Sequence, residues 1–161
     1  MENITIDKNI FVYLTPVSIL GVNVDGRANF MALAWFSRVN SHPPLVAVAV
    51  HQDRYSYQGL RENRTFSINY SNVEMVEATD YCGLVSGKEV DKAQMFEIFY
   101  GELETAPIIK SSPLSFECKL VYEMAFQTHT LFIGEIVSSY VPKQYLSNGQ
   151  PDLQKMNLLC D

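Results

Sequence analysis

The amino-acid sequence predicts a mainly β protein in which antiparallel strands form a barrel and a few helices lie at the periphery. Three observations support this fold class. Six or more stretches carry the residue patterns of strands, whereas helical patterns are few. The Asp25-Gly26 pair between two apolar stretches signals a tight hairpin, which joins antiparallel neighbours. Closing such a sheet into a barrel removes its exposed edges.

The chain of 161 residues is expected to form a single domain that spans residues 1–161. Neither an internal repeat nor a low-complexity tract nor a Pro/Gly/Ser-rich linker divides it. Its hydrophobic fraction of 47% and its charged fraction of 19% are those of a globular protein with a substantial core.

The first elements are strands. Residues 17–24 form one strand, and the Asp25-Gly26 turn leads into a returning strand that spans residues 29–41. The Pro43-Pro44 pair ends this strand, because proline has no N–H to donate to a neighbouring strand. Residues 45–50 are apolar on both faces, which indicates a central strand that is covered on both sides.

Two helices are expected in the middle of the chain. Asp53 is a candidate N-cap for a helix over residues 54–63. Residues 65–70 alternate between large apolar and smaller polar side chains and form a strand. The Ser71–Glu74 segment matches a capping box, which predicts a helix over residues 73–81.

The second half of the chain is mostly strand. Residues 82–91 are polar, contain two glycines and are expected to form a loop. Residues 114–124 alternate between apolar even positions and polar odd positions, which is typical of a strand exposed on one face. Residues 131–141 form another strand, and the polar tail over residues 143–161 contains a turn at residues 147–150.

The charge distribution argues against a nucleic-acid-binding protein. The formal net charge is −6, and no stretch clusters Lys or Arg into the basic face that such proteins carry. No apolar run approaches the ~20 residues of a membrane helix, and residues 1–7 lack the pattern of a secretory signal. We therefore expect a cytoplasmic protein that does not bind membranes.

The three cysteines are expected to be reduced and mostly packed. Cys82, Cys118 and Cys160 are widely spaced, and an odd number without a CxxC motif argues against a disulfide framework and a zinc site. The histidines also lack metal-ligand spacing, and His42 and His51 are expected to be solvated or structural.

Two segments are candidate anion sites. In the first, residues 81–92, glycines permit backbone conformations that turn N–H groups toward an anion, although a plain surface loop fits the same pattern. The residues that would contribute are Gly83, Ser86, Gly87, Lys88 and Lys92. In the second, Arg54 and Ser56 open a helix whose N-terminus favours an anion, although a solvated first turn is the alternative.

A third segment could hold something flat. Ala32 and Ala34 lie between Met31 and Trp35 in the returning strand, where small side chains leave room against the backbone. Together with the two candidate anion sites, this stretch suggests a phosphorylated planar ligand. Motifs for a dinucleotide-binding turn, a P-loop, a serine-hydrolase elbow and a zinc protease are absent from the sequence.

The sequence as a whole resembles the flavin-reductase-like, FMN-binding split-barrel family, nearest its flavoredoxin branch. Six stretches that match family motifs occur in the family's order across nearly the whole chain. They are Asn29-Phe30-Met31-Ala32-Leu33-Ala34-Trp35, Ser41-His42-Pro43-Pro44, Arg54-Tyr55-Ser56-Tyr57, Phe66-Ser67-Ile68-Asn69, Asp80-Tyr81-Cys82-Gly83 with residues 86–92, and residues 129–137. Each motif is weak by itself, and the specificity lies in their order.

The resemblance implies a homodimer of six-stranded antiparallel split barrels, with one FMN per subunit near the dimer interface. It also implies that NAD(P)H or a reduced redox protein delivers electrons to the flavin. The isoalloxazine ring would lie along Asn29, Met31, Ala32, Leu33 and Ala34. Arg54, Ser56 and Tyr57 would hold the ribityl-phosphate end, and Cys82, Ser86, Gly87 and Lys92 would approach the same cofactor. His129 would lie near the open face of the flavin as the catalytic residue, and Trp35 is assigned to the core.

The chain departs from the family pattern at three points. Ala32 replaces the usual Thr and removes a hydroxyl that could reach the flavin, and Lys88 replaces the usual Arg and loses a bidentate phosphate contact. The sequence ends at Asp161, before the usual C-terminal extension, so the site is expected to be more open or covered by the partner subunit. Three functions follow: an FMN-dependent oxidoreductase, a non-catalytic flavin electron carrier, or an empty barrel with a binding role.

Overall fold

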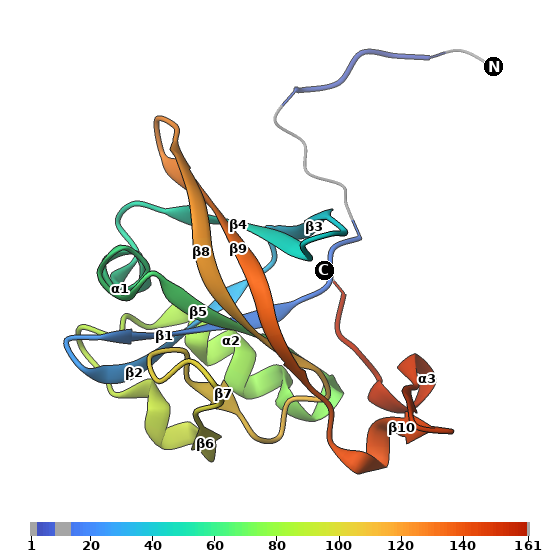
Figure 1. Cartoon of the computed structure of the whole chain (residues 1–161). Coiled ribbons are helices and arrows are strands. Elements are labelled where there is room, and N and C mark those ends of the chain that lie inside the picture. Colours follow the sequence, from blue (N-terminus) through green and yellow to red (C-terminus); the bar gives the residue numbers. More distant parts are fainter. Residues whose placement is uncertain (1–2, 9–13, 161) are drawn as a thin grey trace.

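The centre of the molecule is one antiparallel sheet, shown in Figure 1 in a computed structural model that describes residues 3–8 and 14–160. Its seven strands are β1 (Ser18–Val24), β2 (Arg27–Leu33), β3 (Phe36–Asn40), β4 (Leu45–His51), β5 (Thr65–Tyr70), β8 (Ser115–Ala125) and β9 (His129–Tyr140). Their order across the sheet is β2-β1-β5-β8-β9-β4-β3. The two edge strands, β2 and β3, follow each other in the chain, so the sheet curls into a barrel that is split between them.

The returning strand expected over residues 29–41 is wrong as a single strand. It is interrupted at Ala34 and Trp35, where β2 ends and β3 begins. The backbone N–H of Ala49 donates to the Trp35 carbonyl at 2.9 Å, which draws the chain away from β1 and toward β4. The mainly β antiparallel fold is confirmed, and this break gives its main sheet seven strands where six were expected.

Short helices and two small hairpins surround the sheet. The helices are α1 (Tyr55–Asn63), α2 (Val76–Leu84), α3 (Leu153–Met156) and the 3-10 turns η1 (Val73–Met75), η2 (Lys92–Met95) and η3 (Lys143–Tyr145). The hairpins pair β6 (Ile98–Phe99) with β7 (Ile108–Ile109), and β10 (Leu146–Ser147) with β11 (Gln150–Pro151). No helix in the described ranges has the length and hydrophobicity needed to cross a membrane.

The side-chain caps expected for the two helices in the middle of the chain are wrong. Arg54 occupies the N-cap position of α1, and no side-chain cap hydrogen bond is found there, so Asp53 is not the cap. The chain turns one residue later than expected because the Arg54 N–H donates to the His51 carbonyl at 3.0 Å.

The capping box at Ser71–Glu74 does not form either. The Ser71 N–H donates to the Val17 carbonyl at 3.1 Å, and Asn72 pairs with Leu158, so this backbone stays extended. The helical segment still begins at the expected Val73, as the 3-10 turn η1, and continues as α2 from Val76 to Leu84. Cys82 therefore lies in a helix and not in the expected loop.

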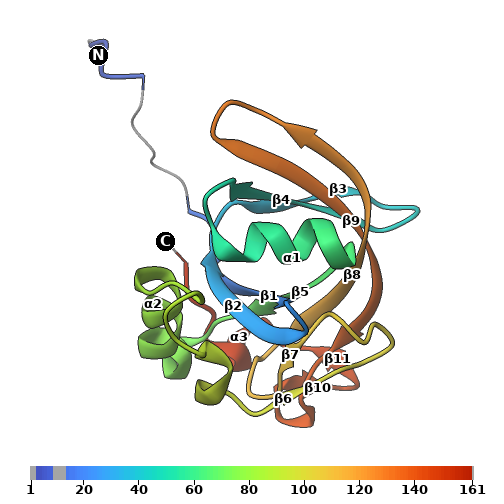
Figure 2. The same cartoon turned by 90° about the vertical axis from the view of Figure 1, so that its left-hand side faces the viewer.

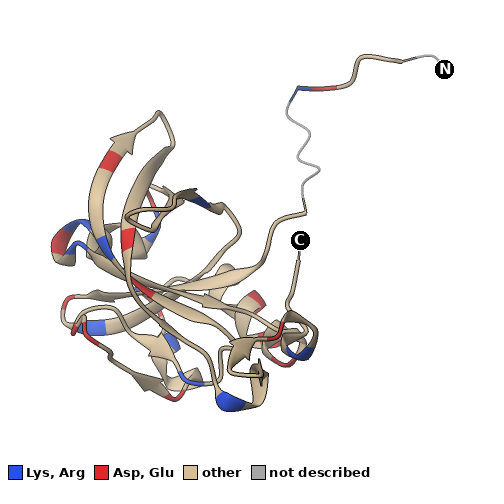
Figure 3. Cartoon of the chain, turned by 45° about the vertical axis from the view of Figure 1, so that its right-hand side comes forward, with Lys and Arg blue, Asp and Glu red and all other residues tan. Residues whose placement is uncertain are grey.

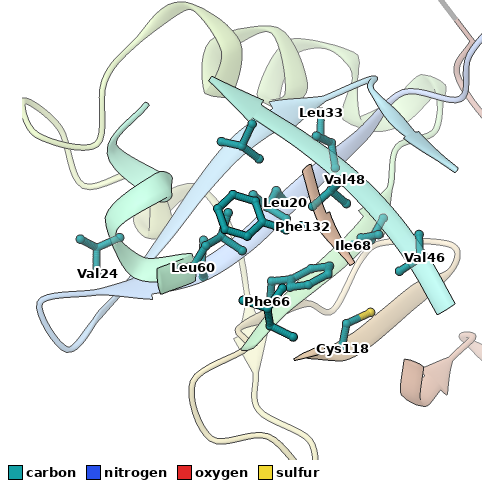
Figure 4. Close-up of a cluster of buried hydrophobic side chains, with 13 residues drawn as sticks. Leu20, Val24, Leu33, Val46, Val48, Leu60, Phe66, Ile68, Cys118 and Phe132 are labelled. Carbon is teal, nitrogen blue, oxygen red and sulfur yellow. The ribbon is translucent and has the colours of Figure 1, made fainter. Parts of the chain in front are cut away.

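The main core lies between the sheet and α1. Figure 2 shows α1 across the open side of the barrel, between β4 and the β1–β2 pair. Thirteen buried residues, most of them aliphatic, form the cluster in Figure 4, with Phe66 and Phe132 as its largest members. The helix approaches β1 closely because Gly59 has no side chain: a Cβ there would lie 2.2 Å from the Asn23 carbonyl oxygen.

Strand β8 does not follow a simple alternation. Glu117, expected on the polar face, is fully buried at 0% exposure, because the segment that precedes β7 covers it and supplies hydrogen-bond donors. Tyr122 and Met124, expected on the apolar face, are 65% and 59% exposed. The end of the β8–β9 hairpin projects beyond the barrel in Figure 1, so neither of its faces meets the core.

Charged side chains are spread over the described surface. In the view of Figure 3, Lys and Arg lie among Asp and Glu and do not gather on one face. The described residues contain no group of three or more His, Cys, Asp or Glu side chains that could hold a metal ion.

All three cysteines are free, and two of them are buried. Burial raises the pKa of Cys82 from 9.0 to about 11, against the opposing effect of Lys92. The folded thiol therefore keeps its proton between pH 9 and 11, whereas the unfolded thiol loses it, so the folded state loses stability across this range. We expect the free energy of unfolding in urea to fall as the pH rises from 9 to 11.

Urea unfolding of cysteine variants over the same pH range should show which thiol causes this fall. The fall should be smaller in Cys82→Ala and unchanged in Cys160→Ala, because Cys160 is exposed. Equal pH profiles for the wild type and Cys82→Ala would contradict the assignment to Cys82.

Candidate functional site

A cavity of about 520 Å³ opens where the barrel is split. Its volume lies within the range that small-molecule sites occupy. The lining comes from the end of β2 and the break after it, from β4 and the loop before α1, and from the start of β9. The residues are Met31, Ala32, Leu33, Ala34, Trp35, Ala49, His51, Asp53, Arg54 and His129.

One side of the cavity has the properties expected for a flat ligand. Ala32 and Ala34 contribute only methyl groups, and Leu33 between them is buried. Because β2 is an edge strand, the backbone groups that point away from β1 have no strand partner and remain available to a ligand. The same three residues also border a second cavity of about 570 Å³ on the α2 side, next to Gly83 and Leu84. The backbone of Ala32–Ala34, which lies between the two cavities and has N–H and C=O groups without a strand partner, fits a planar ring with a polar edge.

The opposite side is aromatic. The Trp35 and His129 rings stack with centroids 4.8 Å apart and an interplanar angle of 28°. Trp35 is 48% exposed, so its assignment to the core is wrong: the strand break turns its side chain out toward His129. Burial lowers the pKa of His129, and the positive charges of His51 and Arg54 lower it further. At neutral pH this imidazole is therefore predominantly uncharged.

The N-terminus of α1 provides an anion site at the edge of the cavity. No side-chain cap satisfies its first turn in the described structure. The Tyr57 N–H donates to the Arg54 carbonyl at 2.9 Å, and the N–H groups of Tyr55 and Ser56 remain available. The positive end of the helix dipole adds to the charge of Arg54, which is exposed and lines the cavity. Ser56, in the same turn, is buried and accepts a hydrogen bond from Asn29 Nδ2 at 2.8 Å.

A smaller polar cavity of about 100 Å³ lies beside β2. Asn29, Gly87 and Lys92 line it. Lys92 is only 4% exposed, and its Nζ donates to the Cys82 carbonyl at 3.1 Å and the Val85 carbonyl at 3.0 Å. Burial lowers the pKa of Lys92, and Arg54 acts in the same direction, against the opposing effect of Cys82. An ammonium has three N–H groups, so one donor of Lys92 is left for a ligand beyond these two carbonyls.

The structure brings the expected site residues together in two groups. Met31, Ala32, Leu33, Ala34, Arg54 and His129 line the larger cavity, and Asn29, Gly87 and Lys92 line the smaller one. The Asn29–Ser56 hydrogen bond connects the second group to α1. The remaining three expected residues have partners within the protein.

Tyr57, Cys82 and Ser86 are engaged in different ways. The Tyr57 hydroxyl lies 3.2 Å from Thr130 Oγ1, the buried Cys82 offers its carbonyl to Lys92, and Ser86 Oγ accepts from the Lys88 N–H. Their role toward a ligand stays a prediction. Sequence reasoning missed Ala49, His51 and Asp53 as cavity residues. Only the pairing of β4 with β9 brings the end of β4 and the loop after it to the cavity.

Gly87 is a sensitive point of this arrangement. A Cβ there would lie 1.9 Å from Asn29 Oδ1, so Gly87→Ala must displace either the loop or Asn29. We expect affinity for a flavin ligand to fall about tenfold, the scale of moderate overpacking. Fluorescence titration measures this, with Gly83→Ala for comparison, because the nearest atom to a Cβ at Gly83 is 3.3 Å away. Equal affinities for both variants would contradict the prediction.

Solved structures share this fold across almost the whole chain. Flavoredoxin from Methanosarcina acetivorans is 50% identical, with a TM-score of 0.96 over 99% of this chain and 86% of that one. Flavoredoxin of Desulfovibrio vulgaris (Miyazaki F) is 31% identical, with a TM-score of 0.86 over 98% and 87%. An FMN-binding protein from Thermus thermophilus, solved with bound 1-cyclohex-2-enone, is 26% identical, with a TM-score of 0.82 over 94% and 86%.

Curated relatives and a family profile agree with these structures. An uncharacterized protein from Aeropyrum pernix is 30% identical over 71% of this chain, which spans 45% of that protein. An FMN reductase (NADH) RutF from Agrobacterium fabrum is 26% identical over 85% of this chain and 82% of that one. Residues 12–153 match the profile described as the flavin reductase like domain. The chain therefore belongs to the flavin reductase like family.

Proposed function

We propose that this protein binds FMN at the split of the barrel and acts as an oxidoreductase of the flavin reductase or flavoredoxin type. It would pass electrons from NAD(P)H or a reduced carrier through the flavin to an acceptor. The observation that carries this proposal is the larger cavity, where the open backbone of Ala32–Ala34, the aromatic pair Trp35–His129 and the cationic N-terminus of α1 meet. Bound FMN supplies the redox chemistry, and the protein supplies binding, orientation and electrostatics.

The residues fit the three parts of FMN. The methyl groups and free backbone of residues 31–34 suit the planar ring and its polar edge, with Asn29 nearby on β2. Arg54 and the uncapped first turn of α1, which contains Ser56 and Tyr57, suit a phosphate. In the proposal Ser86, Gly87 and Lys92 complete the site from the loop after α2, and Cys82 holds Lys92 through its carbonyl.

His129 is proposed as the catalytic residue. Its lowered pKa keeps the imidazole neutral at pH 7, so the ring offers a hydrogen bond without adding a positive charge. A neutral imidazole is also able to exchange a proton with a reduced flavin. Names of relatives support this class of chemistry: the Agrobacterium fabrum relative is an NADH-dependent FMN reductase.

A homodimer is part of the proposal. Apolar side chains are exposed on the β2–β3 break, on β3 and on the projecting β8–β9 hairpin: Trp35, Val39, Tyr122, Met124 and Phe126. An apolar hollow of about 400 Å³ lies beside them, between the β2–β3 break and Leu131. Exposed apolar patches of this kind mark interaction surfaces. Sedimentation equilibrium tests the dimer, and a monomer at micromolar concentration would contradict it.

The first experiment asks whether FMN stays bound. Purified protein is mixed with FMN, desalted and examined by visible spectroscopy, with a variant that blocks the cavity (Ala32→Trp) as the matched control. The wild type should keep a flavin spectrum and the variant should lose it. A colourless wild-type protein after desalting would overturn the proposal and leave the empty barrel.

The second experiment separates an enzyme from an electron carrier. The flavin-loaded protein is mixed anaerobically with NADH or NADPH in a stopped-flow instrument. Rapid loss of the absorbance of oxidised flavin supports direct reduction by a nicotinamide. If neither donor reduces the flavin within minutes, direct reduction by a nicotinamide is excluded. A reduced redox protein is then the donor that is left, either for an oxidoreductase or for the non-catalytic carrier. A single domain over residues 1–161 and a cytoplasmic location remain part of the same proposal.

A further inference from the structure

His51 lies against His129 at the edge of the larger cavity. The two residues face each other in the pairing of β4 with β9, and their ring centroids are 4.9 Å apart at an interplanar angle of 83°. Trp35 covers another side of the same imidazole in a stacked arrangement. The His129 ring therefore contacts a stacked indole and a perpendicular His51 ring. Its Nδ1 also lies 2.9 Å from Thr128 Oγ1.

The ring of His51 is itself fixed by the backbone. The Asp53 N–H donates to His51 Nδ1 at 3.2 Å, so in this arrangement Nδ1 carries no proton, and a neutral ring carries its proton on Nε2. The Asp53 carboxylate lies 3.7 Å from the same nitrogen. Removing the imidazole would therefore free the Asp53 N–H and remove the surface on which His129 packs.

The loop of His51 also connects both ends of the site. The Gln52 N–H donates to the Thr128 carbonyl at 3.0 Å, and Gln52 Nε2 donates to the Phe126 carbonyl at 2.9 Å. On its other side, the Arg54 N–H donates to the His51 carbonyl at 3.0 Å. The segment that begins α1 at the proposed phosphate end is thus attached to the hairpin that carries His129 at the proposed ring end.

We infer that His51 is a positioning residue of the flavin site. It holds the His129 imidazole against Trp35 and at a fixed position relative to the start of α1. The inference rests on the proposed function for the identity of the ligand. The charged or titratable groups that line the cavity with His129 are His51 at the end of β4, and Asp53 and Arg54 in the loop that follows. From α1, the Tyr57 hydroxyl contacts Thr130, the residue after His129. His51 is the one of these whose ring contacts the His129 ring.

The experiment uses three variants of the full chain. His51→Ala removes the ring, and His51→Phe keeps an aromatic ring without nitrogen atoms. His42→Ala removes an exposed imidazole in the turn between β3 and β4, at the opposite end of β4 from His51. Circular dichroism first establishes that each variant is folded. FMN affinity is then measured by fluorescence titration at pH 8.

His51→Ala should weaken FMN binding about fivefold, the scale of losing one cross-strand aromatic pair. His51→Phe should bind within about twofold of the wild type, because the ring contact is kept, and His42→Ala should match the wild type. Wild-type affinity in His51→Ala, or no recovery in His51→Phe, would overturn the inference.

A second measurement needs no flavin. In the free protein the Trp35 ring should shift the NMR signals of the His129 ring protons upfield, because the two rings stack. This shift should shrink in His51→Ala and persist in His51→Phe and His42→Ala. If the wild type binds no FMN, the proposed function fails, and the NMR comparison still decides whether His51 positions His129. An unchanged shift in a folded His51→Ala would overturn the inference whatever the ligand.

Discussion

Replacing Glu117 by glutamine should lower the free energy of unfolding by about 2–4 kcal/mol, the scale of breaking a buried, charge-assisted network. The Glu117 carboxylate accepts from the backbone N–H of Glu102 at 2.9 Å and of Leu103 at 2.8 Å, and also from the Tyr140 hydroxyl. A glutamine keeps the shape but replaces one acceptor oxygen with an NH₂ group. At least one of these donors then faces another donor in a fully buried site.

Urea unfolding at pH 7, followed by circular dichroism, measures this loss. Glu123→Gln is the matched control, because Glu123 lies on the same strand and is exposed, with Arg61 at 3.8 Å as its partner. A surface pair of this kind contributes about 0–1 kcal/mol. If both variants lose the same stability, the role assigned to the buried carboxylate is wrong.

Arg54→Ala should weaken FMN binding by about 1–3 kcal/mol, the range for a lost charge-assisted hydrogen bond. The side chain is exposed and lines the larger cavity at the uncapped end of α1, so its loss should leave the fold intact. Arg54→Lys should fall between the wild type and alanine, since lysine keeps the charge but not the planar fork.

Riboflavin provides the sharpest control for the phosphate end. It lacks the phosphate, so its affinity should be nearly the same for the wild type and Arg54→Ala. Arg61→Ala, in the last turn of the same helix, should bind FMN as the wild type does. Equal losses for FMN and riboflavin in Arg54→Ala would move the phosphate site away from α1.

Lys92 is a different case, although the sequence made it an equal candidate. We expect Lys92→Ala to weaken FMN binding on the same scale of about 1–3 kcal/mol. It should also destabilise the fold, because the ammonium joins the Cys82 and Val85 carbonyls at the end of α2. Lys92→Met keeps the length of the side chain without its donors, and comparing its FMN affinity with its unfolding curve separates the two effects.

Local patterns were sufficient for most strands of this fold. The alternation over β5, the apolar run of β4 and the Asp25-Gly26 turn each predict their element from a few neighbouring residues. Features that depend on contacts between distant parts of the chain could not be predicted from local patterns. The break after β2 depends on the hydrogen bond between Ala49 and Trp35, and the burial of Glu117 depends on a loop fourteen and fifteen residues away.

The same distinction applies to the site. Ala32, Ala34 and Arg54 could be predicted as site residues from the local sequence alone. Small residues in a strand indicate room for a ligand, and a cation at a helix start indicates an anion site. The position of His51 beside His129 depends on the register between two strands that are far apart in sequence. No pattern within either strand specifies that register, so His51 was assigned only a solvated or structural role. Trp35 was misassigned for a related reason, since an indole in an apolar stretch usually packs inside.

The unpaired edge of β2 has a consequence for handling and expressing the protein. A strand with a free edge is a template on which strands of other chains can add, and this is a common route to aggregation. Here the cavity runs along part of that edge, so a molecule bound in it shields backbone groups that would otherwise recruit a neighbour. Cells that lack the ligand would then accumulate a protein that is more prone to aggregate. Adding the ligand to the culture would raise the yield of non-aggregated protein.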